Sequence, residues 1–423
     1  MLNIFTNLSH AGVLEREDLT ARFTYGADIT AQNIVSLTMP PAPNATTPMH
    51  EPDIVHPIFA MNLPEGRLHE SLVRMFSRAI PDMDDMTLFE IVGRSQIGRL
   101  RAAPTIEDLG KIPDVSLRDL LKTHGTENML DELLERYARY SGISGYQPKV
   151  LVRDNDSLGR GDSPFKSSLN RVTALGTTHI VKFFEAEKFP ALAANEYACL
   201  RAARAAGLPV PAFWLSDNAQ CLMLERFDLK QDGAYLAVED CCALAGYYSS
   251  QKKYDGSYEK VAGTLAGVIN PGRLFEDMNV FFRSFVLSVI VRNGDAHLKN
   301  FSVLYNDATD VRLSPVYDIV STVPYNRKDG LALRFNNTHR WPGQKELIQF
   351  GVNLCRLTPA QAKEAIDQVK TAVAKTREEV PPLRDATPDR PSYMALTNML
   401  AAWEDGLSQT SAHQTHLNLK LSS

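Results

Sequence analysis

Cysteine is scarce in this chain of 423 residues, which contains only five. The sequence has no Cys-x-x-Cys pair, and no histidine stands near a cysteine at a spacing suited to zinc, so neither a zinc site nor a disulfide framework is indicated. We expect these residues to be buried, reduced thiols: Cys199, Cys221, Cys241, Cys242 and Cys355.

Long apolar runs are also absent. No window reaches the roughly 20 apolar residues that a membrane-spanning helix needs, and the longest run, at 281–291, is interrupted by Arg283. The N-terminus lacks a charged leader followed by an apolar core. Together these absences predict a cytoplasmic location and no contact with a membrane.

Basic residues are not in excess, since 45 Lys and Arg face 50 Asp and Glu and give a formal net charge of -5. A protein that binds nucleic acid by itself usually presents a strongly basic surface. We therefore expect any contact with DNA to be indirect, through a partner protein. Hydrophobic residues make up 44% of the chain, which suffices for a packed interior, and the length favours two or three subdomains.

The pattern of short strands and helices predicts an α+β fold that begins with a small N-terminal α/β subdomain over residues 1–104. Alternating apolar residues favour strands within 2–8 and 21–25. Helical periodicity favours helices at 66–78 and 87–92. Six prolines in the stretch between these strands and helices exclude a regular element there.

A second lobe is expected over residues 105–228, with a strong helix, a glycine-rich turn and buried strands. A mainly helical lobe is expected over 229–407. There Thr358 caps a helix, which the prolines between 381 and 391 are expected to end. Residues 408–423 have few aromatics and much Ser, Gln, Thr and His, which predicts a disordered tail.

One stretch carries polar residues in a particular order: Asp295, then Asn300 five positions later, then Asp318 after a short apolar hairpin. Transfer of a phosphoryl group from ATP needs metal ions that neutralise the triphosphate, and oxygen ligands that hold those ions. Asn300 and Asp318 can supply such ligands. A separate carboxylate must orient or deprotonate the acceptor hydroxyl, and protein kinases place it five residues before the metal-binding Asn. Asp295 has that spacing.

The segments around this stretch favour the same interpretation. Residues 281–291 have the pattern of a buried helix, and 301–305 and 311–314 have that of a hairpin, so the loop between them would be rigidly supported. A single acid here would be explained equally well as a helix cap or a turn residue. An ordered and correctly spaced set is much harder to explain in that way.

Lys182 lies in the apolar interior of a strand predicted at 178–184. A lysine there needs an anionic partner to offset its desolvation, and a nucleotide phosphate could be that partner. Glu196, on a helix predicted at 192–206, could pair with Lys182, as the acid on the following helix does in protein kinases. The alternative is an edge strand with Lys182 facing water.

Two further segments could contact a nucleotide. The Gly- and Ser-rich turn at 142–149 precedes a strand, so its backbone N–H groups could approach a phosphate and Lys149 would add a cation. An ordinary helix-to-strand connection explains this turn as well. The strand at 221–228 runs into a polar turn like the hinge of a kinase, where Asp228 is the candidate for the ribose, although a plain strand end has the same pattern.

Together these segments resemble the HipA family of bacterial serine/threonine kinase toxins, over nearly the whole chain. The resemblance rests on motifs that occur in the family's order: Asn62–Gly66, Glu90–Arg94, Ser144–Lys149, His179–Lys182, Asn195–Leu200, Leu224–Asp228, Asn293–Ser302 and Pro315–Val320. It implies a bilobal, protein-kinase-like fold in which residues 105–228 form the ATP-binding lobe and 229–407 form the catalytic lobe.

By this resemblance Asp295 is the catalytic acid, and Asn300 and Asp318 are the magnesium ligands. The resemblance also implies that ATP contacts residues of the glycine-rich loop, the lysine strand, the hinge and the catalytic loop: Ser144, Gly145, Tyr146, Gln147, Lys149, Lys182, Glu225, Arg226, Phe227, Asp228, His297, Lys299, Asn300, Tyr317 and Asp318. Such toxins typically phosphorylate an aminoacyl-tRNA synthetase, which halts translation, and a DNA-binding antitoxin of the same operon restrains them.

One position departs from the family pattern. The family's glycine-rich loop often carries a serine whose autophosphorylation switches the kinase off, and this chain has Gly142 there. Autophosphorylation is therefore expected at Ser144 or Ser141. Negative charge added beside the triphosphate site would repel ATP and reorganise the loop.

Two other functions fit parts of the pattern. A small-molecule phosphotransferase of the aminoglycoside or choline kinase type also combines a Gly-Asp pair with a later Asn and Asp, but it needs neither the N-terminal subdomain nor the loop at 144–149. A non-catalytic binding protein with a kinase shape should have lost at least one polar residue that the chemistry requires.

Overall fold

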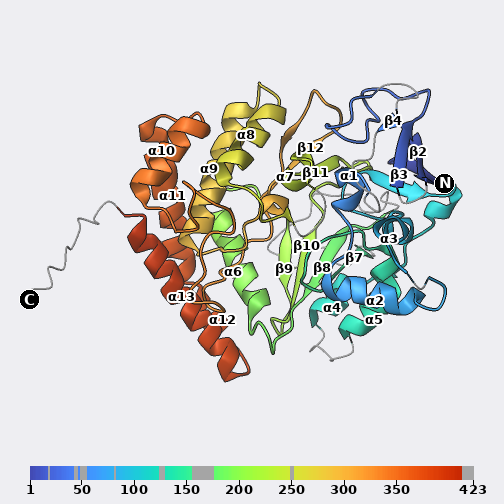
Figure 1. Cartoon of the computed structure of the whole chain (residues 1–423). Coiled ribbons are helices and arrows are strands. Elements are labelled where there is room, and N and C mark those ends of the chain that lie inside the picture. The colour runs from blue at the N-terminus through green and yellow to red at the C-terminus, as the bar shows by residue number, and fades with distance from the viewer. Residues whose placement is uncertain are drawn as a thin grey trace, which may run out of the picture.

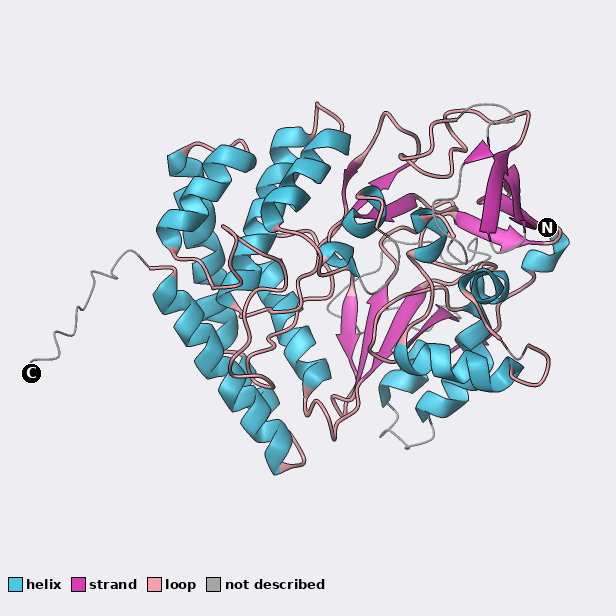
Figure 2. Cartoon of the chain, in the orientation of Figure 1, coloured by secondary structure: helices cyan, strands magenta, loops and turns pink. Residues whose placement is uncertain are grey.

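The computed structural model of the chain describes residues 1–17, 20–41, 46–47, 55–80, 82–122, 129–154, 176–247 and 252–411. Sheets with their flanking helices occupy one side of the molecule, and a block of long helices occupies the other (Figures 1 and 2). The first part of the chain lies on the sheet side, and the last part forms the helical block.

The N-terminal part consists of β1 (Leu2–Thr6), β2 (Ser9–Glu17), β3 (Thr20–Tyr25), β4 (Thr46–Thr47), α1 (Pro57–Ala60), α2 (Gly66–Phe76), α3 (Asp85–Val92) and β5 (Leu100–Ala103). The strands form an antiparallel sheet in the order β4-β3-β2-β1-β5. Alternate residues such as Ile4, Leu14 and Phe23 are fully buried on one face. Residues of α1 and α3 share one hydrophobic core with the buried face of this sheet.

The next part consists of β6 (Asp114–Val115), α4 (Leu117–Lys122), α5 (Met129–Tyr137), β7 (Lys149–Asp154), β8 (His179–Phe183), α6 (Leu192–Ala205), β9 (Phe213–Leu215) and β10 (Cys221–Glu225). Its sheet has the order β6-β7-β8-β10-β9. The antiparallel register of β7 and β8 places Lys149 directly opposite Lys182. Two like charges opposite each other repel, so the two lysines need anionic partners nearby.

The third part consists of β11 (Ala237–Asp240), α7 (Cys241–Leu244), α8 (Tyr258–Val268), α9 (Leu274–Ile290), β12 (Ser302–Tyr305), β13 (Arg312–Leu313), α10 (Gln344–Leu354), α11 (Pro359–Arg377), α12 (Val380–Asp385) and α13 (Arg390–Gln409). Strand β12 pairs with both β11 and β13. Helix α9 is buried over most of its length and packs against α8, α11 and α13. It therefore gives the segment that follows it a rigid base.

Two large hydrophobic cores run through the molecule. One fills the helical block and includes Phe281, Phe285 and Trp403. The other extends without a break from the N-terminal sheet, with Phe59, into β7 and β8, with Val150. The N-terminal part is therefore packed onto the second sheet through a shared core.

Several expectations from the sequence change in the structure. The prolines at 381 and 382 do not break a helix, because α11 has already ended at Arg377 and both prolines lie in the first turn of α12, where a missing N–H group is tolerated. The predicted tail begins too early, since α13 continues to Gln409, and residues 412–423 lie outside the described part. The proline-rich stretch contains the two-residue strand β4.

Two other expectations concern cysteines and membranes. All five cysteines are buried and free, which confirms the predicted thiols. Within the described residues, no helix combines the length and apolar character required to cross a lipid bilayer.

Candidate active site

A cavity of about 580 Å³ is lined by the second sheet, by the segments around β11 and β12, and by residues of the N-terminal part. Its volume suits a nucleotide-sized ligand. It brings together most of the residues that the sequence predicts for a nucleotide site: Ser144, Gly145, Tyr146, Gln147, Lys149, Lys182, Glu225, Phe227, Asp295, His297, Lys299, Asn300, Tyr317 and Asp318.

Asp295 is held by a tightly constrained loop after α9. Arg292 has a positive φ of 58°, a conformation that is unfavourable for a side chain of this kind. Gly294 has no room for a side chain, since a Cβ there would lie 2.2 Å from Oδ2 of Asp329. The N–H group of Asp295 donates to Oδ1 of Asn293 at 3.1 Å. The backbone of Asp295 therefore has little freedom.

The carboxylate of Asp295 accepts a 2.7 Å hydrogen bond at Oδ1 from the hydroxyl of Tyr254. Burial raises the pKa of Asp295 to about 6; the Tyr254 bond opposes this rise, and the charge of Asp318 adds to it. A carboxylate with such a pKa is ionised at neutral pH and well matched to accept a proton. Burial, together with Lys253, lowers the pKa of His297 to about 3, so its imidazole is neutral.

Lys182 on β8 bridges two carboxylates. Its Nζ lies 2.6 Å from Oε1 of Glu196 on α6 and 2.6 Å from Oδ1 of Asp318, and the first contact confirms the predicted pair. Burial by itself lowers the pKa of Lys182, but the two carboxylates outweigh burial and raise it. Burial likewise acts to raise the pKa of Asp318, whereas Lys182 and Lys149 hold it below its usual range. Both groups are charged at neutral pH.

The segment that carries Asp318 is clamped to helix α6. Asp318 has a positive φ of 56°, which is unfavourable for aspartate outside special turns. Just beyond it, the amide of Asn195 donates to the carbonyl of Ser321 and accepts from the N–H of Ser321, each at 2.8 Å. This double contact supports the strained conformation and keeps Asp318 next to Lys182.

Asn300 offers an oxygen to a cation. Its Nδ2 donates to the carbonyl of Asp318 at 3.3 Å, while its Oδ1 is buried and accepts no hydrogen bond from the described residues. A buried oxygen of this kind normally has a partner. No group of three or more His, Cys, Asp and Glu suited to a metal occurs among the described residues. Asn300 and Asp318 fit Mg²⁺, which commonly takes one or two protein ligands together with substrate phosphates.

The glycine-rich loop lies over Lys149. Gly145 has a positive φ of 115°, and a Cβ at this position would lie 2.4 Å from Nζ of Lys149, so glycine is required here. Lys149 is almost fully buried, and burial lowers its pKa although Asp318 opposes this. Lys149 and Lys182 together present two cations to one cavity, as a polyanionic ligand would require.

The two serines proposed for autophosphorylation lie in different environments. Ser141 is fully buried, and its hydroxyl donates to the carbonyl of Tyr137 and accepts from the N–H of Leu151, each at 2.8 Å. Ser144 is half-buried and lines the cavity. The absence of a serine at Gly142 also has a steric reason, because a Cβ there would lie 2.4 Å from Cβ of Gln96.

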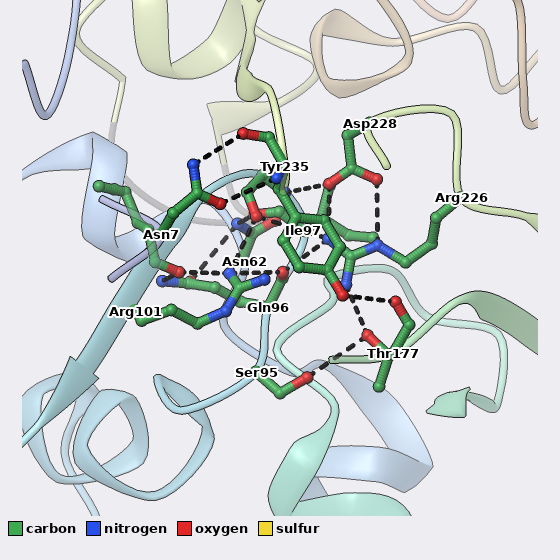
Figure 3. Close-up of polar contacts among 12 residues, drawn as sticks. Asn7, Asn62, Ser95, Gln96, Ile97, Arg101, Thr177, Arg226, Asp228 and Tyr235 are labelled. Atoms are coloured by element: carbon green, nitrogen blue, oxygen red, sulfur yellow. Dashed lines mark hydrogen bonds and ion pairs between the residues drawn. The ribbon is translucent and has the colours of Figure 1, made fainter. Parts of the chain in front are cut away.

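The hinge divides its side chains between two environments. Phe227 lines the cavity and stacks on Tyr317, with ring centroids 5.3 Å apart. Arg226 and Asp228 do not line it. Both are almost fully buried and form an ion pair of 2.5 Å (Figure 3). The N–H of Gly98 also donates to Asp228, at 2.7 Å. The structure thus turns the side chains of Arg226 and Asp228 away from the cavity, which speaks against their predicted contacts with a nucleotide.

The cavity also contains residues that the sequence did not single out for this site. Lys253 lies 3.3 Å from Oε2 of Glu65, and Lys299 lies 3.8 Å from Oε1 of the same residue. Nζ of Lys299 donates to the carbonyl of Met61 at 2.8 Å. The N-terminal part therefore closes one side of the cavity. The motif Asn62–Gly66 belongs to the family resemblance, but its pattern does not indicate contact with the segment that carries Asp295 and Asn300.

The two lobes, the Lys182–Glu196 pair and the loop that carries Asp295, Asn300 and Asp318 define a protein with a kinase-like fold. Comparison with models of known protein families supports this assignment of the fold. The model of the HipA-like C-terminal domain matches residues 141–377, and that of the HipA N-terminal domain matches residues 2–103. This chain belongs to the HipA family.

Individual relatives are distant. The Sinorhizobium fredii protein Y4dM, which bears the name of a kinase, is 29% identical over 305 residues, or 68% of this chain and 67% of Y4dM. The serine/threonine-protein kinase toxin HipA of Shewanella oneidensis is 24% identical over 383 residues, covering 82% and 83% of the two chains. A solved structure of Shewanella HipA with HipB and operator DNA matches the fold, with a TM-score of 0.68, 18% identity and 97% of each chain covered.

Proposed function

We propose that this protein is an ATP- and Mg²⁺-dependent serine/threonine protein kinase and the toxin of a toxin–antitoxin module. The observation that carries this proposal is the position of Lys182 between Glu196 and Asp318, in the same cavity as Asp295 and as the side-chain oxygen of Asn300, which has no partner within the described part of the chain. Each group that phosphoryl transfer requires has a candidate there.

Lys182 and Lys149 would bind the phosphates of ATP, and the loop at 144–147 would cover them with its backbone. Asn300 and Asp318 would hold Mg²⁺, which neutralises phosphate charge when it is bound. Glu196 keeps Lys182 in place through its 2.6 Å ion pair. Glu225, through its backbone, and Phe227 would contact the adenine at the hinge.

Asp295 would act on the acceptor. The oxygen of a serine or threonine hydroxyl attacks the γ-phosphorus of ATP, the bond to the β-phosphate oxygen breaks, and ADP leaves with the bonding electrons. Asp295 accepts the proton of the hydroxyl. Its pKa of about 6 supports this role, since the group is ionised at neutral pH.

Self-inactivation would use Ser144 rather than Ser141. Ser144 lines the cavity, whereas both hydrogen-bonding positions of Ser141 are used in the fold. A phosphate on Ser144 would compete for the lysines that bind ATP. Mass spectrometry of the expressed chain tests this, and phosphate on Ser141 alone would overturn it.

The partners follow from the family. A DNA-binding antitoxin is proposed because the solved structure of Shewanella HipA also contains HipB and operator DNA. A cytoplasmic location and a protein substrate concerned with translation, such as an aminoacyl-tRNA synthetase, complete the proposal. Any DNA contact of this chain would be made through the antitoxin.

Quantitative phosphoproteomics of cells that express the wild type or Asp295→Gln tests the function. We expect growth arrest and a small set of new phosphoserine or phosphothreonine sites only with the wild type, and relief by the antitoxin. Equal toxicity of the two chains would remove catalysis from the explanation. Phosphate on a small molecule instead of a protein would favour the aminoglycoside or choline kinase type.

A further inference from the structure

Tyr254 touches the proposed catalytic carboxylate, although none of the roles above uses it. Its hydroxyl donates to Oδ1 of Asp295 at 2.7 Å. Its ring meets the imidazole of His297 edge to face, with centroids 5.2 Å apart. The side chain lines the cavity and is 44% exposed, so burial in a core does not explain its place.

The segment around Tyr254 is fixed to the catalytic loop on both sides. On one side, the N–H of Leu298 donates to the carbonyl of Lys253 at 3.1 Å, and Nζ of Lys253 pairs with Glu65 at 3.3 Å. On the other, the N–H of Arg334 donates to the carbonyl of Gly256 at 3.3 Å. These contacts aim the phenol of Tyr254 at Asp295.

The two oxygens of Asp295 are therefore in different environments. Oδ1 accepts the Tyr254 hydroxyl, whereas no group in the described part of the chain donates to Oδ2. A general base needs an oxygen within hydrogen-bond reach of the proton that it takes. Oδ2 is the oxygen that can meet an acceptor hydroxyl.

We propose, on the basis of the kinase function proposed above, that Tyr254 is a positioning residue for Asp295: it fixes the carboxylate through Oδ1 and leaves Oδ2 for the acceptor hydroxyl. The N-terminal part contributes through Glu65, which holds the neighbouring Lys253. Positioning of the base is thus shared between the catalytic loop and the N-terminal subdomain.

The charged groups around Asp295 give the sign of the expected effect. Tyr254 and Lys253 favour the ionised carboxylate, whereas Asp318 and Asp329 disfavour it. The substitution Tyr254→Phe removes the stronger of the two favourable contacts, so the pKa of Asp295 should rise. A hydrogen bond to a charged group corresponds to a shift of about one to two pH units.

The first test follows ADP formation from MgATP between pH 5 and 9.5 by the whole chain. With Tyr254→Phe we expect the acidic midpoint to rise by about one unit, a kcat that stays about tenfold lower even near pH 9, where Asp295 is fully ionised, and an unchanged KM for ATP. The control is Tyr393→Phe, an exposed tyrosine on α13 that does not line the cavity. Full recovery of kcat near pH 9, which would leave only an effect on the pKa of Asp295, or no change at any pH, would overturn the positioning role.

A second readout does not depend on catalysis. The carboxyl resonance of Asp295 is titrated in chain labelled with [4-¹³C]aspartate and is assigned with Asp295→Asn. The midpoint should move upward in Tyr254→Phe. If the wild type forms no ADP even with a cell extract as the source of acceptor hydroxyls, the kinase proposal fails, whereas the carbon titration still tests the contact between Tyr254 and Asp295. If ADP forms but the midpoint does not move, the positioning role fails and the kinase proposal stands.

Discussion

Two clusters of buried charged residues flank the hinge, and they differ in whether their polar atoms have partners. In the hinge cluster, Arg226 donates to Asp228, to Thr177 and to the carbonyl of Gln96 (Figure 3). In the site cluster, Lys182 and Asp318 also form an ion pair, but both face a cavity, and Oδ1 of Asn300 in that cavity has no partner among the residues that the structure describes.

The comparison shows that buried charge alone does not mark an active site. The hinge cluster joins the N-terminal part, through Gln96 and Gly98, to residues 226–228, and the guanidinium groups of Arg101 and Arg226 lie 4.5 and 4.3 Å from the ring centre of Tyr235. The charges of Arg226 and Asp228 are satisfied by the protein, whereas Nη2 of the neighbouring Arg101 finds no acceptor among the described residues. The site cluster is satisfied only in part, which leaves capacity for a ligand.

The largest effect on activity is expected for Asp318→Asn, which tests whether the site cluster serves a ligand. We expect ADP formation to fall about 10³-fold or more, because a ligand of the metal and a partner of Lys182 is lost. The melting temperature should also fall, though by less than for a buried pair that loses its single carboxylate, because Lys182 and Lys149 lose the charge of Asp318 while Glu196 still pairs with Lys182. Full Mg²⁺-dependent activity in this variant would refute the assignment.

The matching substitution in the hinge cluster is Asp228→Asn. It leaves the fully buried Arg226 without its carboxylate, which should reduce the free energy of unfolding by about 3–5 kcal/mol. Denaturation measures this, and calorimetry at low temperature should show that the folded variant still binds ATP. Unchanged stability together with lost ATP affinity would instead support a contact between Asp228 and the ribose of ATP.

Asp295→Asn should stabilise the fold. Folding raises the pKa of Asp295 from 3.8 to about 6, so the folded state holds the proton more tightly and the ionised carboxylate is destabilising above pH 6. The gain for the amide should be on the order of 1–3 kcal/mol at pH 7.5 and should vanish below about pH 4, as the wild type is protonated. Thermal melts at both pH values check this, and a gain that is independent of pH would contradict it.

The smallest effect is expected for Glu65→Gln. Its ion pair with Lys253 is partly exposed and is worth about 0.2–1 kcal/mol, so the rate of ADP formation should fall about two- to fivefold. The control is Asp131→Asn, which removes an exposed pair with Arg67 outside the cavity. Equal effects of the two variants would show that the N-terminal part does not contribute to the site through Glu65.

Local spacing was enough to predict the features that depend on it. The order Asp295, Asn300 and Asp318 lies within one short segment, and the structure places all three in one cavity. The pair Lys182–Glu196 was predictable because a buried lysine needs a nearby acid and the following helix supplies one. The roles of these residues stay predictions.

Features that depend on long-range packing could not be predicted in the same way. Asp228 lies at the right distance after its strand, but its orientation depends on Gly98, which is 130 residues away in the chain. Tyr254 reaches Asp295 across 41 residues, and no periodicity links the two. Sequence patterns predict that a helix or strand is present, whereas the direction in which one of its side chains points depends on the residues that pack beside it.

The most direct test of the account is transfer of ³²P from [γ-³²P]ATP with Mg²⁺ by the purified wild type and by Asp295→Asn, with ATP binding measured on the same samples. We predict that both bind ATP and that only the wild type transfers phosphate to protein serine or threonine. Binding without transfer by the wild type, or equal transfer by both chains, would contradict the central claim that Asp295 is the base of a protein kinase.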